Sequence, residues 1–278
     1  MLGRVRVLII GASGYLGSEL LRQAAAAGHD ATGTQFSARH QELRQLDIRD
    51  AGAVADAIAE ARPDAAVNAA YDKGSWAATA VGPGHLAACC ARAGVRLVHV
   101  SSDAVFSGDL DLYDESCDPS PVSEYGAAKA AAEVVVAARC PEAVIVRTSW
   151  ITGDGRSGTE RLVASLARGG SGVLFTDDVK TPVHVADLAA ALLELCASDV
   201  AGVVHVAGAD AVSRYELGRM IAARDGLDPA ALPAGSRASA GMKPSVVRLD
   251  VTRAAGLLAT RLRGAREFTA VTPPGPKA

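Results

Sequence analysis

Short apolar runs alternate with alanine-rich helical stretches over most of the chain. The runs that predict strands are residues 5–11, 31–36, 64–70, 96–102, 143–149, 172–175 and 202–208. The stretches that predict helices are residues 15–27, 51–61, 77–93, 123–139, 158–168 and 185–197. Several strand runs are apolar at consecutive positions, which is typical of strands covered on both faces. The alternation predicts an α/β protein with a doubly wound parallel sheet, the Rossmann architecture.

The alternation of strand-like and helix-like segments ends after residue 210. Ser213 and Glu216 have the spacing of a capping box and indicate the start of a helix. Residues 228–245 are rich in proline, glycine and serine and predict a loop. A further short helix follows, with Thr252 as its predicted N-cap.

These changes suggest two parts. We expect a Rossmann domain over residues 1–149, to which residues 181–210 return, and a smaller C-terminal substrate lobe over residues 150–278. The lobe is expected to lie over the carboxyl edge of the sheet, because ligands of doubly wound folds bind there.

Composition narrows the class of protein. With 278 residues, 49% hydrophobic and 21% charged, the chain is typical of a globular protein. Its net charge of −3 argues against a nucleic-acid partner, since phosphate binding needs a basic surface. We find no signal-peptide pattern and no apolar stretch of about 18 residues, so we expect a cytoplasmic protein without a membrane partner. The five cysteines show no C-x-x-C spacing, and we expect no metal site.

Three glycines separate the first predicted strand from the first predicted helix. Gly11, Gly14 and Gly17 form the pattern G-x-x-G-x-x-G. Glycines at such a turn let the backbone approach a pyrophosphate and let helix and strand pack closely. We therefore expect these glycines and Ser13 to bind a dinucleotide at the start of the helix. The alternative is a simple strand-to-helix turn.

The end of the second predicted strand bears on the choice of cofactor. It falls near Gln35, where an acidic side chain would bind the ribose 2′-hydroxyl of NAD. Asp30 comes too early in the strand for this role. Ser37 and Arg39 follow the strand instead and are placed to bind a 2′-phosphate. The sequence favours NADP(H), with NAD(H) possible; Arg39 as an ordinary solvated charge is the alternative.

A tyrosine and a lysine stand four residues apart in a predicted helix. Tyr125 and Lys129 therefore leave the same face of that helix. We expect the ammonium of Lys129 to lower the phenol pKa, ordinarily about 10, toward the range useful for proton transfer. We also expect Tyr125 and Lys129 to bind the cofactor, with Lys129 holding its ribose hydroxyls. Ser102 ends a predicted strand that faces the same crevice, and is expected to donate a hydrogen bond to a substrate oxygen. Together they predict reduction of a ketone by hydride from a nicotinamide.

The motifs GASGYLG, NAA, SSDAVF and YGAAK follow one another in this order. In these motifs the chain resembles the extended short-chain dehydrogenase/reductases, and more closely the dTDP-4-dehydrorhamnose reductase-like (sugar nucleotide-binding) family. The similarity extends from residue 4 to about residue 268. It implies an NAD(P)-dependent oxidoreductase that reduces a nucleotide-linked 4-keto-6-deoxy sugar in deoxysugar biosynthesis, and it makes a homodimer possible.

The resemblance also implies roles for individual residues. Ser102, Tyr125 and Lys129 match the family's catalytic residues, and Asp103 and Trp150 match positions that contact the sugar. The cofactor residues that it implies are Gly14, Tyr15 and Leu16 at the pyrophosphate, Asp47 and Ile48 at the adenine, and Ala69, Ala70 and Tyr71 beside the nicotinamide ribose.

The chain departs from the family pattern near the expected substrate. Ser102 replaces the usual threonine, Ala104 replaces an aromatic residue, and Thr79 falls where asparagine is usual. The loop after residue 71 is also short. Two alternatives therefore stay open: a non-catalytic NADP-binding regulatory subunit, or a ketoreductase of another small substrate.

Overall fold

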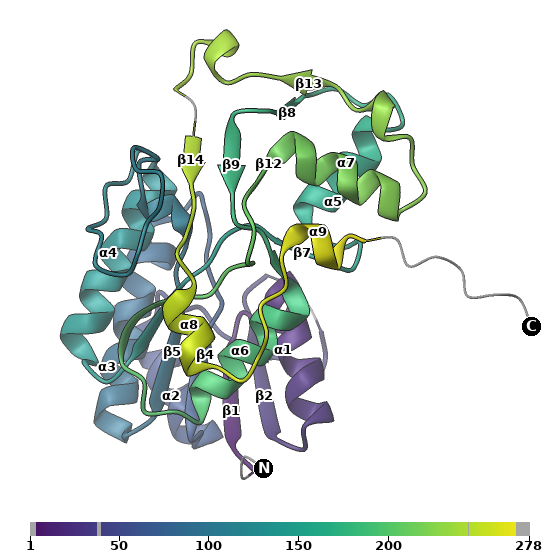
Figure 1. Ribbon diagram of the computed structural model, residues 1–278. Helices are drawn as coiled ribbons and strands as arrows, with labels where there is room; N and C mark the ends of the chain where they lie inside the picture. The colour runs from purple at the N-terminus through teal and green to yellow at the C-terminus, as the bar shows by residue number, and fades with distance from the viewer. Residues whose placement is uncertain (1–3, 38–39, 244, 271–278) are drawn as a thin grey trace, which may run out of the picture.

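The computed structural model describes residues 4–37, 40–243 and 245–270, and its centre is a sheet of seven parallel strands (Figure 1). Their spatial order is β11–β6–β5–β4–β1–β2–β3. After β3 the chain crosses over to β4, which pairs with the other side of β1. The predicted doubly wound parallel sheet is therefore confirmed. The strands are β1 (Arg6–Ile10), β2 (Asp30–Gln35), β3 (Arg44–Gln45), β4 (Ala65–Asn68), β5 (Arg96–Val100), β6 (Val144–Arg147) and β11 (Gly202–His205).

Helices cover both faces of this sheet. Alternate residues of β1 point to opposite sides: Val7 and Ile9 pack in one apolar cluster, whereas Leu8 and Ile10 pack in another. Burial on both sides explains why the strands read as continuous apolar runs. The first cluster includes α1 (Tyr15–Ala26) and α6 (Val185–Cys196), and the second includes α2 (Ala51–Ala61), α3 (Gly82–Ala93) and α4 (Glu124–Arg139).

A smaller lobe stands over one end of the sheet (Figure 1). Its core lies between α5 (Gly158–Leu166) and α7 (Arg214–Arg224), and includes Val163, Leu174 and Leu217. Strand β9 is the middle strand of a small sheet, between β12 and β14. The short strands of this part are β7 (Ile151–Thr152), β8 (Leu174–Phe175), β9 (Asp178–Lys180), β10 (Val183–His184), β12 (Val212–Ser213), β13 (Ala234–Gly235) and β14 (Ser245–Val247).

The chain passes between the two parts more than once. Strand β11 follows the lobe strands β7 to β10 in sequence, yet it pairs with β6 in the central sheet. The division between residues 149 and 150 stays a prediction. The remaining short elements are η1 (Ala77–Val81), η2 (Asp103–Val105), η3 (Pro229–Ala231), η4 (Ala238–Ala240), α8 (Thr252–Leu257) and α9 (Ala265–Phe268).

Two helix starts test the local sequence signals. The predicted capping box is confirmed, because Ser213 accepts from the backbone of Glu216 and the Glu216 side chain bonds back to Ser213. Thr252 as the N-cap of α8 is wrong. The N-cap is Val251, and Thr252 instead donates its backbone N–H to the side chain of Asp250 at 2.8 Å.

A buried ion pair fastens α4 to the sheet. Arg147, at the end of β6, lies 2.8 Å from the carboxylate of Glu133, and both side chains are about 95% buried. Ser101 also donates to Glu133, and Arg147 donates to the carbonyl of Cys117 at 3.3 Å. Such a pair keeps the helix in one position, because moving the helix away would leave a buried charge without its partner, at a high cost in free energy.

Replacing Glu133 with alanine is expected to lower the free energy of unfolding by about 3–5 kcal/mol, because the guanidinium of Arg147 stays buried without its counter-charge. Urea unfolding followed by circular dichroism measures this change. The matched control is Glu60→Ala, which removes an exposed pair with Arg44 and should cost about 0–1 kcal/mol. Equal losses in the two variants would contradict the role given to the buried pair.

Candidate active site

The turn between β1 and α1 has the geometry of a phosphate-binding loop. Gly11 has a φ of +84°, and a Cβ on Gly17 would lie 2.2 Å from the carbonyl oxygen of Gly11. Gly14 is the N-cap of α1 and has no side chain to occupy the first N–H groups of the helix. Ser13 and Gly14 are exposed, whereas Leu16 is buried. The turn therefore presents free N–H groups and the positive end of a helix dipole to a ligand.

Tyr15, the first residue of α1, also touches the second lobe. Its hydroxyl accepts from the backbone N–H of Asp154 at 3.4 Å. The guanidinium of Arg156 lies 5.8 Å from the centre of the Tyr15 ring. Sequence reasoning predicted only a backbone contact of Tyr15 with the pyrophosphate and missed this link, because the 153–157 segment is far away in sequence.

At the end of β2, the side chain of Gln35 turns inward. It donates to the carbonyls of His40 and Leu43 at 2.9 and 3.0 Å, and accepts from the N–H of His40 at 2.9 Å. An amide that holds the following loop cannot act as the ribose-binding acid of an NAD site. Ser37 is exposed beside this loop. Arg39, also predicted to bind a 2′-phosphate, lies outside the described residues.

The predicted adenine contacts lie close to a second arginine. Asp47 is half-buried and forms an ion pair with Arg49 at 2.7 Å. The Arg49 guanidinium also lies 5.0 Å from the centre of the exposed Phe36 ring. Ile48 is buried against Gly82, whose Cβ would come within 2.7 Å of it. Sequence reasoning missed Arg49, a cation beside the predicted adenine contacts.

Strand β4 brings the predicted nicotinamide residues against the glycine turn. The backbone of Ala70 is so close to Gly11 that a Cβ there would lie 2.9 Å from it. Asn68 accepts from the N–H of Ala70 at 3.2 Å and bonds His99 at 3.1 Å. Ala69 is half-buried, and Tyr71 exposes its ring.

Tyr125 and Ser102 come together because α4 touches the turn after β5. A Cβ on Gly126 would lie 2.0 Å from the carbonyl oxygen of Ala104, so only glycine permits this approach. Ser123 caps the helix by accepting from the N–H of Gly126 at 3.1 Å. Sequence reasoning missed Gly126, although a glycine directly after the candidate tyrosine was a signal of close packing.

The electrostatics of Tyr125 differ from the expectation. Burial, together with neighbouring Tyr71, raises the pKa of the Tyr125 phenol, and the Ser102 hydroxyl only partly opposes this shift. The predicted lowering by Lys129 is therefore wrong for this structure. The Lys129 ammonium donates to the carbonyl of Val100 at 3.0 Å. It also lies 5.4 Å from the centre of the Tyr71 ring.

Lys129 is itself perturbed. Its side chain is buried, and burial lowers its pKa to about 8, although the charge of Glu133 acts in the opposite direction. Burial and the charge of Lys129 also hold the pKa of His99 well below its usual range. His99 beneath it is therefore neutral and adds no second positive charge.

Asp103 joins the catalytic turn to the second lobe. Its carboxylate lies 2.8 Å from the ammonium of Lys180 in β9 and accepts from the hydroxyl of Ser149 at 2.8 Å. Its other oxygen accepts from Ser102 at 3.3 Å. The ion pair is largely buried, and sequence reasoning did not predict it.

Trp150 lies beside this ion pair. Its ring centre is 3.8 Å from the guanidinium of Arg214 and 5.8 Å from the ammonium of Lys180. The ring also packs against the core of the second lobe. The place of Trp150 at the crevice stays a prediction. The structure adds that the side chains of Lys180 and Arg214 lie beside its ring.

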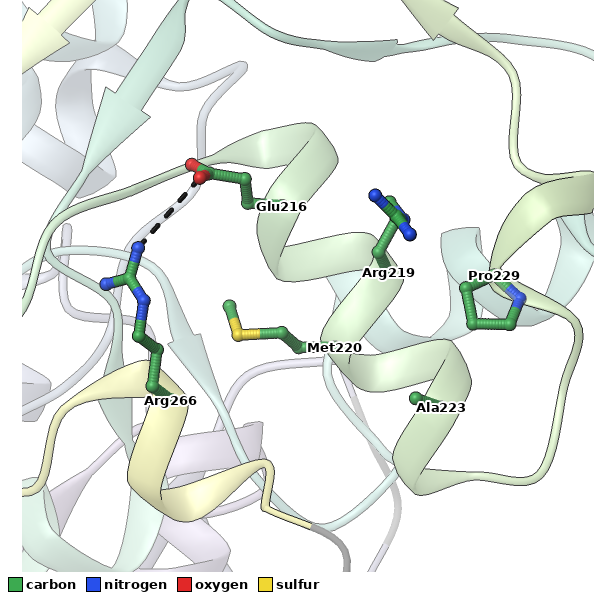
Figure 2. A pocket seen from close by; sticks show the side chains of 6 residues that line it. All are labelled: Glu216, Arg219, Met220, Ala223, Pro229 and Arg266. Atoms are coloured by element: carbon green, nitrogen blue, oxygen red, sulfur yellow. Dashed lines mark ion pairs between the residues drawn. The ribbon is translucent and has the colours of Figure 1, made fainter.

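Figure 2 shows a different groove, along α7. Within it, Arg266 lies 3.9 Å from Glu216. None of the predicted catalytic or cofactor residues lines this groove, which is formed by Glu216, Arg219, Met220, Ala223, Pro229 and Arg266.

Comparison with known proteins shows the family. The family model of the RmlD substrate binding domain matches residues 5–270. The chain belongs to this family. Among its relatives, dTDP-4-dehydrorhamnose reductase of Mycobacterium tuberculosis is 38% identical over 235 residues, covering 81% of this chain and 77% of that protein. The dTDP-4-keto-6-deoxy-D-glucose reductase of Streptomyces niveus is 32% identical over 274 residues, covering 92% and 93%.

A solved structure agrees with this membership of the RmlD family. The dTDP-4-dehydrorhamnose reductase of Bacillus anthracis, crystallised with NADP, superposes with a TM-score of 0.82 at 26% identity. The match covers 96% of this chain and 97% of that one. In the described ranges, no helix has the length and apolar character needed to span a membrane. The same ranges contain no group of three or more metal-binding side chains.

The shifted pKa of Lys129 predicts a pH-dependent stability. The pKa is about 8 in the folded chain against a usual 10.5, so between these values the unfolded chain binds a proton that the folded chain lacks. The stability of the wild type, relative to Lys129→Met, should therefore rise from pH 8 to pH 10.5 by at most about 3 kcal/mol. Urea titrations of both proteins across this range measure the difference. A difference that does not change with pH would contradict the prediction.

Proposed function

We propose that this protein reduces the keto group of a dTDP-linked 4-keto-6-deoxy sugar with NADPH, and that Tyr125 is the proton donor. The observation that carries the proposal is the position of the Tyr125 phenol, which lies beside the Ser102 hydroxyl just after β5. A phenol that keeps its proton at neutral pH suits the reductive direction, in which the catalyst must donate a proton. The relatives from M. tuberculosis and S. niveus are both named as dTDP-sugar reductases.

The residues present fit a dinucleotide phosphate. The turn leaves no room for a Cβ at Gly17 and presents uncapped N–H groups at the start of α1. Gln35 places an inward-facing amide where a carboxylate would repel a 2′-phosphate. The nicotinamide, when bound, supplies hydride. We assign the pyrophosphate to the glycine turn with Ser13, and the nicotinamide side to Ala69, Ala70 and Tyr71.

The residues of the chain account for the movement of the proton. The Tyr125 hydroxyl gives its proton to the carbonyl oxygen of the sugar, and we assign the ammonium of Lys129 to the hydroxyls of the nicotinamide ribose. Ser102 turns its O–H from Asp103 toward the same oxygen as charge develops there. Asp103, neutralised by Lys180, then accepts from a sugar hydroxyl. The cytoplasmic location and the homodimer stay predictions.

Replacing Tyr125 with phenylalanine removes the proton donor and should lower the rate of reduction by about 10²–10⁴-fold. The rate is followed as loss of NADPH absorbance with a dTDP-4-keto-6-deoxy sugar as substrate. Binding of NADPH, measured by calorimetry, should be unchanged. Tyr215→Phe is the matched control, because Tyr215 packs in the second lobe and its loss of a hydroxyl should not alter the rate.

Two outcomes would contradict the proposed function. If wild type and Tyr125→Phe turn over equally fast, Tyr125 is not the donor. If neither turns over any keto sugar while both bind NADPH, the regulatory alternative is supported.

A further inference from the structure

A cavity of about 400 Å³ lies against Tyr125, between the loop after β4 and the first turns of α4. None of the residues predicted to bind the cofactor lines it, apart from Tyr125 itself. Its size falls within the range of small-molecule pockets. The polar and aromatic residues that line it are Asp72, Lys73, Ser75, Trp76, Thr79, Glu124 and Tyr125.

The exposed aromatic rings of the chain are confined to one edge of the sheet. All eleven aromatic residues lie in the described ranges, and only Phe36, Tyr71 and Trp76 are more than half exposed. Phe36 directly follows β2, and the other two follow β4, so all three lie at the carboxyl edge. Exposed apolar rings concentrated along a ligand-binding edge indicate surfaces that a ligand covers.

The three rings differ in what already covers them. Phe36 has the guanidinium of Arg49 on its face, and Tyr71 has the ring of Tyr125 at 5.7 Å. Within the part of the chain that the structure describes, no cationic or aromatic side chain stacks on Trp76. Its ring is therefore available to a ligand in the cavity.

The loop that carries Trp76 is held in place before any ligand arrives. The Thr79 hydroxyl donates to the carbonyl of Asp72 at 2.6 Å and accepts from its N–H at 3.0 Å. The carboxylate of Asp72 accepts from the N–H of Gly74 at 2.9 Å. Trp76 then leads into η1, a π-helical turn of a kind that is frequent at functional sites. A preorganised platform loses little conformational entropy on binding.

We propose that this cavity is a pyranose subsite, with Trp76 as the platform for the apolar face of the sugar ring. Dispersion favours packing of the C–H groups of a pyranose on an aromatic face. Sugar hydroxyls can donate to the carboxylate of Glu124 and bond to Ser75. The proposal rests on the proposed function, since Tyr125 must reach the keto group of the same sugar.

The test compares two probes that differ only by the sugar, dTDP-glucose and dTDP, by calorimetry in the presence of NADPH. Trp76→Leu should weaken binding of dTDP-glucose by about tenfold and leave binding of dTDP unchanged. Trp76→Phe should restore most of the lost affinity, because it keeps an aromatic face. The matched control is Val81→Ala, which alters an exposed residue of η1 that does not line the cavity, and it should bind both probes like the wild type.

Neither probe carries a keto group, so the result does not depend on turnover. If the wild type reduced none of the keto sugars tested, the proposed function would be overturned. The difference between dTDP-glucose and dTDP binding could still be measured in that case. Equal losses for dTDP-glucose and dTDP in Trp76→Leu, or no loss for either, would overturn the subsite.

Discussion

The candidate active site depends on one close contact, that between Gly126 and the backbone of Ala104. Without a side chain at Gly126, the first turn of α4 rests directly on the turn that follows β5. This contact brings the hydroxyl of Tyr125 to that of Ser102. The buried pair of Arg147 and Glu133 fastens the same helix a little further along. Because packed interiors do not deform continuously, the two fastenings set the position of the phenol.

The same packing explains the electrostatics of the site. Holding Tyr125 and Lys129 out of water raises the pKa of the phenol and lowers that of the ammonium. Both shifts favour neutral forms, and the neutral phenol is the form that can donate a proton. The Lys129 ammonium donates to the carbonyl of Val100, which ties the side chain to the end of β5.

Local patterns in the sequence were sufficient for part of this site. The glycine turn and the four-residue spacing of Tyr125 and Lys129 could be predicted because each pattern lies within a few consecutive residues. The pair of Asp103 and Lys180 and the inward turn of Gln35 were not predicted, since they depend on how distant segments fold together. The prediction of Thr252 as the N-cap of α8 failed for a different reason: Thr252 is already the first residue of the helix, and its backbone N–H donates to the side chain of Asp250.

The ion pair of Asp103 and Lys180 shows why the second lobe matters to the chemistry. Asp103 follows directly on Ser102, so its orientation influences where the serine proton points. Its counter-charge comes from β9, whose neighbours β12 and β14 belong to the second lobe. A shift of that lobe would therefore change the charge around Ser102. The second lobe is thus joined by an ion pair to the turn that carries Ser102, even though the two parts are built from separate sheets.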